Sequence, residues 1–170
     1  MPYYVDVRKL ATGGSGTTGS PWTGWNTAIG TGVANTTYYF PQGYYSWPCS
    51  TQLLINKNRV RFIGEGKWVT TLRCTGFPTQ GLSNRATAAA LKFDSGVVDA
   101  QLGQIVIENL TFEATDTTNK KKAIELVDLS DSTFRNVLLS GWTGGTGGSL
   151  GWYIRGRDGL TFENLTVTSD

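Results

Sequence analysis

The chain has no histidine, two cysteines and one methionine among its 170 residues. Without histidine, Ser-His-Asp and Cys-His catalysis are excluded, as is any zinc or iron site built on imidazole. Charged residues make up 16% of the sequence, below the usual share of about a quarter, and the net charge is +2. No basic patch is interleaved with aromatic residues, so we expect no nucleic-acid partner.

Long hydrophobic runs are also missing. No stretch of about 18 apolar residues occurs, so we expect no membrane span and no membrane partner. The N-terminus lacks a basic segment followed by an apolar one, so the chain shows no signal peptide of its own. This absence does not by itself indicate a cytoplasmic protein.

A short phrase centred on asparagine occurs three times in the second half of the chain, at an almost constant spacing. The copies are residues 107–112 (IENLTF), 134–139 (FRNVLL) and 162–167 (FENLTV). A near-fixed period of this kind, with strand-type alternation and no helical stripe, is typical of solenoids. We predict an all-β parallel β-helix of about four to five rungs with three strands each.

The repeated asparagine has a physical explanation. Where two strands meet at a sharp corner, one residue adopts a left-handed backbone conformation, which asparagine tolerates better than other non-glycine residues. Amides stacked above one another can also hydrogen-bond along the axis. We therefore predict a structural ladder formed by Asn109, Asn136 and Asn164.

Residues 1–48 are predicted to form an N-terminal strand, a loop and a capping helix, and residues 49–170 the rungs. Ser20 suits the N-cap of the helix and Pro21 its first turn. The helix would cover the open first rung. Its expected apolar face consists of Trp22, Trp25, Ile29 and Val33. Because the sequence stops directly after a predicted strand, we expect the solenoid to be truncated at the C-terminus.

Strand segments are expected along most of the chain. Residues 36–47 fit a strand, a Pro-Gln-Gly turn and a second strand. The other expected strands cover residues 3–7, 52–55, 59–63, 71–74, 90–93, 123–126 and 152–155.

The two cysteines, Cys49 and Cys74, are separated by nearly one period of the repeat. Neighbouring strands lie about 4.8 Å apart, within the Cα range of a disulfide. A bridge between successive rungs is therefore one interpretation. We favour the other, two buried free thiols in the core.

Four segments follow one another in the first part of the chain. They are residues 5–7 (VDV), the glycine-rich loop with its predicted helix, residues 39–45 (YFPQGYY) and residues 60–66 (VRFIGEG). In this order they resemble the N-terminal part of the pectate-lyase-like superfamily of right-handed β-helices, which includes many phage tailspikes. The resemblance extends through the generic rungs to the end of the chain.

The resemblance implies a right-handed, single-stranded β-helix that acts on or binds polysaccharides outside the cell, often as a homotrimer in phages. It implies calcium by analogy alone, and the acidic residues do not show the spacing of a calcium loop. Family members often carry an aspartate pair in the loop where this chain has residues 16–19 (GTTG). Any role of those acids is not available here, and we predict no cofactor and no metal site.

Polysaccharide cleavage requires paired carboxylates, or a carboxylate-held cation together with a basic residue. Outward positions of successive rungs place Lys92 beside Glu125, and these two are the candidate catalytic residues. The candidate substrate-binding residues are Tyr153, Arg155, Trp142, Trp152 and Asp94, with the two tryptophans as a sugar-stacking platform. The alternative is an ordinary row of surface charges that pair across the sheet.

Other patterns receive a structural interpretation. Glu108, Arg135 and Glu163 would stack with alternating charge directly before the asparagines. Residues 64–67 (GEGK) and 144–148 (GGTGG) invite a phosphate-loop interpretation, but neither has the Walker spacing and neither leads into a convincing helix. We predict no phosphate site at either segment.

The sequence therefore predicts a glycan-directed domain, mainly scaffold and binding surface, whose partner is a polysaccharide or a cell-surface glycan. We expect an extracellular location, in a secreted protein or a phage particle. Two alternatives stay open. One is an active polysaccharide lyase or glycoside hydrolase that uses the face with Lys92 and Glu125. The other is a purely structural trimeric stalk.

Overall fold

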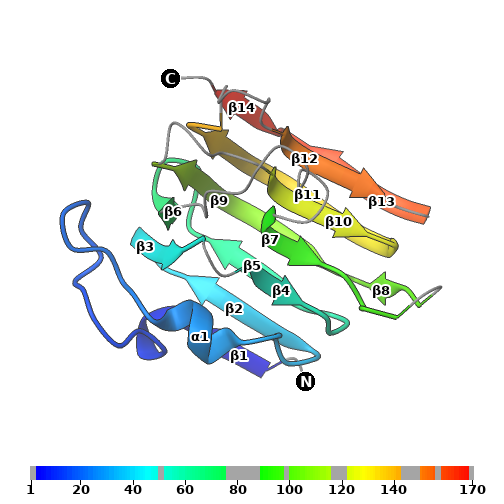
Figure 1. Ribbon diagram of the computed structural model, residues 1–170, viewed down its shortest axis with the longest axis horizontal. Coiled ribbons are helices and arrows are strands. Elements are labelled where there is room, and N and C mark those ends of the chain that lie inside the picture. The colour runs from blue at the N-terminus through cyan, green and yellow to red at the C-terminus, as the bar shows by residue number, and fades with distance from the viewer. Residues whose placement is uncertain are drawn as a thin grey trace, which may run out of the picture.

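The structure is a computed structural model that describes residues 3–49, 52–75, 89–97, 100–115, 122–142, 150–155 and 158–168. It is mostly β, with 59% of residues in strands and 6% in helices. The strands succeed one another in chain order from β1 (Tyr3–Asp6) at one end to β14 (Thr166–Thr168) at the other (Figure 1). The two ends of the chain therefore lie at opposite ends of the stack.

Parallel strands form two sheets around one core. The remaining strands are β2 (Thr36–Phe40), β3 (Gly43–Pro48), β4 (Leu53–Ile55), β5 (Arg61–Gly64), β6 (Thr70–Thr75), β7 (Ala89–Phe93), β8 (Leu102–Gly103), β9 (Val106–Ala114), β10 (Lys122–Val127), β11 (Leu129–Ser140), β12 (Leu150–Arg155) and β13 (Asp158–Glu163). The smaller sheet has the order β12-β10-β7-β4. The larger has ten strands, along the main path β1-β2-β5-β9-β11-β13.

The three repeated phrases lie on adjacent strands. Phe134 of β11 is opposite Ile107 of β9 and Phe162 of β13. Ile107 and Phe134 are fully buried, as are the apolar residues that follow the first two asparagines. The near-constant spacing of the phrases therefore sets the register, because only this register keeps every apolar position on the core side.

Asn109, Asn136 and Asn164 form a column at a bend in the larger sheet. Their φ angles are 59°, 52° and 50°, in the left-handed region. The Asn136 amide donates to Asn109 Oδ1 at 3.0 Å, and the Asn164 amide donates to Asn136 Oδ1 at 2.7 Å. The predicted ladder is confirmed, and we call these residues the asparagine column.

Charged residues directly before the asparagine column also pair as predicted. Arg135 lies 2.6 Å from Glu108 and 3.7 Å from Glu163. Arg135 and Glu163 are exposed, so each pair contributes at most about 1 kcal/mol. The row supports the sheet and offers no catalytic group.

The predicted fold class, a right-handed parallel β-helix of three-stranded rungs, is wrong: the structure shows two mostly parallel sheets, the larger curled like half a barrel. We expected separate strands on either side of each asparagine. Instead β9 and β11 continue through Asn109 and Asn136 as single bent strands of one sheet. Parallel sheets are otherwise typical of α/β proteins, whose helices cover both faces. Few helices are present in the described part of this chain.

A second column of left-handed residues crosses the larger sheet at the opposite ends of its strands. Because Thr37 is opposite Arg61, and Val106 is opposite both Arg61 and Thr133, the residues two positions earlier are also neighbours. These are Asn35, Arg59, Gln104 and Asp131, with φ of 59°, 59°, 58° and 46°. We call them the mixed column.

The N-terminal helix is shorter than predicted. Helix α1 covers only Trp25–Ile29, and it begins after Gly24, whose φ of 78° is left-handed. Trp22 lies outside the helix and bridges to Tyr45 as a parallel strand residue. The prediction that the helix begins at Ser20 and Pro21 was wrong, because the chain that follows them is extended and pairs with a neighbouring strand. Val33, which was expected on the apolar face of the helix, lies outside it and is 58% exposed.

Trp25 is the main contribution of α1 to the core. Its ring is fully buried and contacts Phe40, Tyr45 and Trp47 edge-on, with ring centroids 5.4–6.4 Å apart. Its indole N–H donates to the carbonyl of Ser46 at 3.1 Å. Such edge-to-face contacts add about 0.5–1.5 kcal/mol each beyond the burial of apolar area.

Cys49 and Cys74 form a disulfide with a Cα–Cα distance of 5.5 Å. The favoured prediction of two free thiols was therefore wrong, and the bridge between neighbouring strands is correct. The reason is the parallel register of β3 and β6, which places Trp47 opposite Cys74 and brings Cys49 within bonding range. A disulfide is compatible with a location other than the reducing cytosol.

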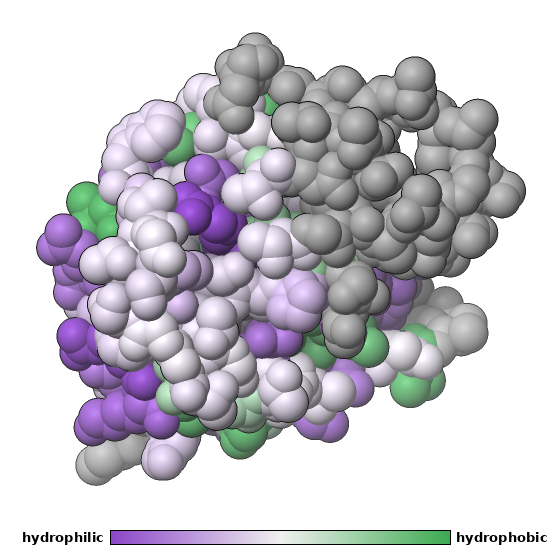
Figure 2. All heavy atoms as spheres, turned by 60° about the vertical axis from the view of Figure 1, so that its left-hand side comes forward, coloured by the Kyte–Doolittle hydropathy of each residue, from purple (hydrophilic) through white to green (hydrophobic). Residues whose placement is uncertain are grey.

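On the face that includes the loop before α1, the described residues do not form one large hydrophobic or one large hydrophilic area. Hydrophobic residues appear there as small separate patches among pale and hydrophilic ones (Figure 2). This agrees with the low fraction of charged residues, and it directs attention to individual exposed aromatic side chains.

Candidate functional site

The predicted catalytic row has the expected register. Glu125 of β10 is opposite Lys92 of β7 on one side and Tyr153 of β12 on the other. Sequence spacing therefore placed these three side chains correctly as neighbours on the smaller sheet.

Glu125, however, does not lie on an open face. It is 5% exposed, and its Oε2 lies 3.3 Å from Nζ of Lys122, which is also buried. The contact is an ion pair without hydrogen-bond geometry, because Glu125 Oε2 accepts no hydrogen bond from the described residues. Nζ of Lys122 also lies 3.9 Å from the centre of the Tyr153 ring, a cation–π contact.

Lys92 is paired with another carboxylate. Its Nζ lies 2.7 Å from Asp94 Oδ2, and the N–H of Gly96 donates to Asp94 Oδ1 at 2.9 Å. Burial alone raises the pKa of Asp94, but these hydrogen bonds and the charges of Lys92 and Arg155 together hold it below its usual value. Asp94 is therefore ionised at neutral pH and unsuited to donate a proton.

The two tryptophans do not form a sugar-stacking platform. Trp142 is 2% exposed, and its indole N–H donates to the carbonyl of Phe112 at 3.0 Å. Trp152 is half-buried, is opposite the buried Ile124, and packs edge-on against Phe134. Trp142 belongs to the core and Trp152 packs against it, because both occupy inward positions that the sequence did not resolve. Arg155 is exposed.

The smaller sheet thus brings the predicted residues together without leaving a free carboxylate for acid–base chemistry. Glu125 is closed off by Lys122, and Asp94 is held by Lys92. Acid–base catalysis requires a carboxylate within hydrogen-bond reach of the reacting group. The site that sequence reasoning missed lies on the larger sheet.

The loop of residues 65–69, between β5 and β6, is fixed to β9, to β14 and to Asn164 between β13 and β14. The N–H of Gly66 donates to the carbonyl of Asn109 at 3.1 Å. Nζ of Lys67 reaches the carbonyl and Oδ1 of Asn164 at 3.1 and 3.0 Å, and Thr166 Oγ1 at 3.3 Å. We call this segment the Trp68 loop. Lys67 supplies the donor for the last oxygen of the asparagine column.

Trp68 is the exposed centre of this loop. Its side chain is 69% exposed, although its φ of 69° is one that bulky residues rarely adopt. Its N–H donates to Thr111 Oγ1 at 3.0 Å, which holds the backbone in this conformation. Backbone strain of this kind costs about 1–3 kcal/mol and is found most often at functional sites.

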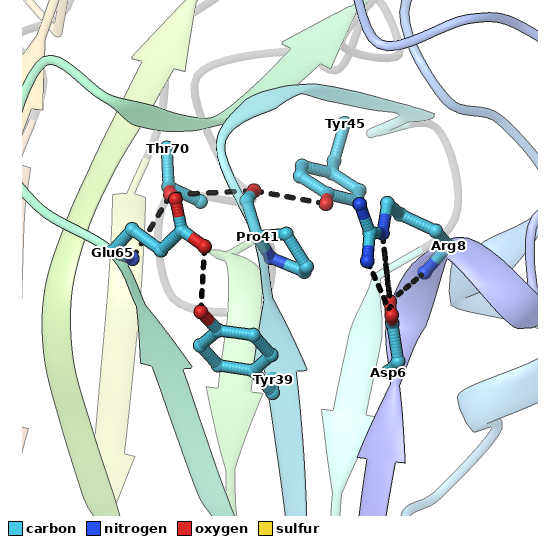
Figure 3. Close-up of polar contacts among 7 residues, drawn as sticks. All are labelled: Asp6, Arg8, Tyr39, Pro41, Tyr45, Glu65 and Thr70. Atoms are coloured by element: carbon cyan, nitrogen blue, oxygen red, sulfur yellow. Dashed lines mark hydrogen bonds and ion pairs between the residues drawn. The ribbon is translucent and has the colours of Figure 1, made fainter.

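Glu65, at the start of the loop, is held by two strands (Figure 3). The Tyr39 hydroxyl donates to Glu65 Oε1 at 2.6 Å, and this bond to a carboxylate, with burial, raises the pKa of Tyr39 to about 12. The N–H of Glu65 donates to Thr70 Oγ1 at 3.1 Å, and that hydroxyl donates to the carbonyl of Phe40 at 3.2 Å. The base of the Trp68 loop is thereby rigid.

A second exposed ring lies beside Tyr39. The rings of Tyr4 and Tyr39 have centroids 5.4 Å apart and an interplanar angle of 32°, and Tyr4 is 60% exposed. Asp6 and Arg8 lie nearby, with Arg8 Nη2 2.6 Å from Asp6 Oδ2 (Figure 3). The hydrogen bond from Arg8 holds the pKa of Asp6 below its usual value, although burial acts in the opposite direction.

The charges of this region balance one another. Asp6 is paired with Arg8, and Glu65 and Lys67 are separated by one residue of the same loop. The region therefore combines exposed aromatic faces with polar groups and little net charge. Such a surface suits a polar, uncharged ligand with apolar ring faces.

Sequence reasoning considered this segment as part of the family resemblance, through residues 60–66, and as a possible phosphate loop. As the sequence indicated, no helix follows this segment: the loop leads into strand β6. The overlooked signal was a tryptophan that directly follows Gly-Glu-Gly-Lys, in a turn where a large apolar residue is unusual.

Among the described residues, no group of three or more Cys, Asp or Glu could hold a metal ion. No helix in the same part of the chain has the length and apolar character needed to cross a bilayer. Comparison with family models, curated proteins and solved structures gives no match for this chain. The resemblance to the pectate-lyase-like superfamily therefore stays a prediction.

Proposed function

We propose that this protein is an extracellular glycan-binding domain and that the Trp68 loop forms its binding surface. The ligand is a polysaccharide or a cell-surface glycan, on which the indole of Trp68 stacks against the apolar face of a sugar ring. The domain belongs to a secreted protein or to a phage particle.

The observation that supports this proposal is the exposed ring of Trp68 on a strained but fixed backbone. Glycine would adopt this φ with less strain than tryptophan, so the fold itself does not require a tryptophan at this position. Its ring also buries little area. A rigid exposed indole, by contrast, offers a large contact surface at low entropic cost to a ligand with an apolar face.

Polar groups at and near the base of the loop add directional contacts. Glu65 is exposed and Tyr4 offers a second ring, while the ion pair of Asp6 and Arg8 lies at the end of β1. Carboxylate and guanidinium groups exchange hydrogen bonds readily with hydroxyl groups. Together with Trp68 these side chains could orient a sugar, which stacking alone does not do.

We test the proposal with a panel of insoluble and soluble polysaccharides and the variants Trp68→Gly and Tyr3→Ala. Tyr3 is a matched control because its ring is 68% exposed, close to the 69% of Trp68. Strand alternation directs Tyr3 to the face opposite Tyr4. Glycine suits the left-handed φ of residue 68, so the first variant removes the ring without adding strain.

We expect Trp68→Gly to weaken binding about tenfold or more, as the loss of one stacked ring implies, and Tyr3→Ala to bind as the parent does. Equal binding by all three proteins contradicts the proposal. The same incubations are followed for new reducing ends and for the ultraviolet absorbance of unsaturated products, which report hydrolysis and elimination respectively.

A further inference from the structure

An open groove of about 500 Å³ lies along the mixed column, at the opposite ends of the strands from the Trp68 loop. It crosses successive strands of the larger sheet, and its lining is polar apart from Ala34 and a glycine. The lining adds Asn58, Gln101 and Ser130 to the four residues of the mixed column.

Two residues of the mixed column are poorly suited to their backbone conformation. Arg59 and Gln104 have φ of 59° and 58°, where asparagine, aspartate and glycine are favoured. The same bend at the asparagine column uses asparagine in every strand. A long side chain at a left-handed position is a cost to the fold, which points to a use for the side chain itself.

Main-chain groups along the groove are already paired. The N–H groups of Asn35, Arg59 and Gln104 donate to the carbonyls of Asn58, Gly103 and Ser130 at 3.2, 2.9 and 3.1 Å. A ligand cannot add a strand here, because the edge hydrogen bonds it would need are occupied. Recognition therefore depends on side chains.

Several of these side chains retain hydrogen-bonding capacity. Gln101 and Gln104 are exposed, and their amides make no hydrogen bond to the described residues. Asn58 Oδ1 accepts from the N–H of Gly103 at 2.8 Å, which fixes the side chain and leaves its NH₂ group as a donor. Arg59 Nη1 donates weakly to Asn35 Oδ1 at 3.4 Å.

The groove has balanced charge, one guanidinium from Arg59 and one carboxylate from Asp131. Its remaining polar groups are amides and a hydroxyl, each of which both donates and accepts. Hydroxyl groups of a sugar also donate and accept, and therefore match such a lining at many positions. An anionic ligand would meet Asp131, and a peptide would find neither a free strand edge nor an aromatic anchor.

We propose that this groove is a second glycan site, which binds a linear, uncharged oligosaccharide whose long axis crosses the strands. Neighbouring strands are about 4.8 Å apart, so the four strands of the mixed column extend over roughly 14 Å. A chain of several sugar units is needed to contact Asn35 at one end and Asp131 at the other. The site uses no residue of the Trp68 loop.

The test uses the whole chain, labelled with ¹⁵N, and neutral linear hexasaccharides of the cello-, malto-, manno- and xylo- series with their disaccharides. The side-chain NH₂ signals of asparagine and glutamine report the groove directly by NMR. We compare the parent with the double variant Arg59→Gly/Gln104→Gly and with Trp68→Gly. Glycine is favoured at residues 59 and 104, so the double variant is expected to fold.

At least one hexasaccharide is expected to shift the amide signals of Gln101 and Gln104, with its disaccharide about tenfold weaker because fewer contacts form. The double variant should lose this binding and Trp68→Gly should keep it. Silence of the groove amides with every hexasaccharide overturns the inference, as does unchanged binding by the double variant. Binding that only Trp68→Gly abolishes overturns the groove and leaves the proposed function standing.

Failure of the proposed function is recognised separately. If Trp68→Gly binds every glycan as the parent does while the groove amides respond, the Trp68 loop is wrong and the groove is right. Stronger shifts with an extended Gly/Ser peptide than with the hexasaccharides would assign the groove to a peptide and overturn the glycan proposal for it.

Discussion

The asparagine column and the mixed column share one backbone conformation and differ in their side chains. Each crosses neighbouring strands of the larger sheet with φ between 46° and 59°. In the first column one residue type repeats and its amides bond to one another. In the second, four different residues occupy equivalent places, and the bond between the Arg59 and Asn35 side chains is 3.4 Å long.

This difference separates two uses of the same bend. A column of identical amides satisfies its own donors and acceptors, so it stabilises the sheet and offers little to a ligand. A column of unlike residues leaves its polar groups directed at solvent. Backbone geometry alone does not reveal the distinction; the residue types and their hydrogen bonds do.

The largest effect is expected at the centre of the asparagine column. Asn136→Leu removes both ladder hydrogen bonds and places a branched side chain at φ 52°. We expect the free energy of unfolding to fall by about 2–4 kcal/mol. Denaturant titration measures it, and Asn136→Gly separates the loss of the amide from the backbone strain. A change below about 0.5 kcal/mol would mean that the ladder does not stabilise the fold.

Lys67 tests whether the open end of the asparagine column needs a donor. Lys67→Met keeps most of the side-chain volume and removes the ammonium group that contacts Asn164 and Thr166. We expect a loss of about 1–2 kcal/mol, since hydrogen bonds from charged groups are stronger than neutral ones but this one is near the surface. Lys9→Met, at an exposed position, is the control and should leave the stability unchanged in the same denaturant titration.

The mixed column should respond in the opposite direction. Gln104→Gly and Arg59→Gly replace residues that are strained at left-handed φ, and we expect each to raise stability by about 0.5–1 kcal/mol. The same change in the asparagine column, Asn136→Gly, should lower it. Thermal unfolding of the three variants under the same conditions shows the direction in which each substitution changes the stability. Destabilisation by Gln104→Gly would show that its side chain supports the fold and would remove the contrast.

The smallest effect concerns pH and the loop that docks on the asparagine column. The folded pKa of Tyr39 is about 12, above the ordinary value of 10.0, because its hydroxyl donates to Glu65. A raised folded pKa gives stability that is complete below pH 10 and is lost as the pH rises towards 12. In a pH titration followed by tyrosinate absorbance, Tyr39→Phe should show one fewer tyrosine with a raised pKa than the parent protein. Identical titrations of the two proteins would contradict the contact.

Much of the strand pattern followed from the sequence. The alternation of apolar residues placed β1, β2, β3, β7, β10 and β12 within a few residues of their observed bounds. The asparagine period predicted the register of β9, β11 and β13, and the same spacing made Lys92, Glu125 and Tyr153 neighbours. These are local or periodic properties, since apolar faces must meet in a parallel pair.

Predictions that depend on how deeply a side chain is buried were wrong. Glu125 occupies an outward position by alternation but is closed off by Lys122, which precedes it on the same strand. Trp142 and Trp152 were expected at the surface and pack inward. The Trp68 loop was missed because its exposure follows from contacts with Asn109, Thr111 and Asn164, which are distant in sequence.

Residue order along the chain was enough to establish which residues form strands, that the strands stack in parallel at a near-constant period, and that asparagines occupy one bend. Three-dimensional packing established the rest: the strands form two sheets, β9 and β11 continue through their asparagines, Cys49 and Cys74 are bonded, and only some polar groups stay open to solvent. The reason is physical. Alternation and periodicity are properties of neighbouring residues along the chain. Burial, pairing and strain depend on what other strands bring to the same place.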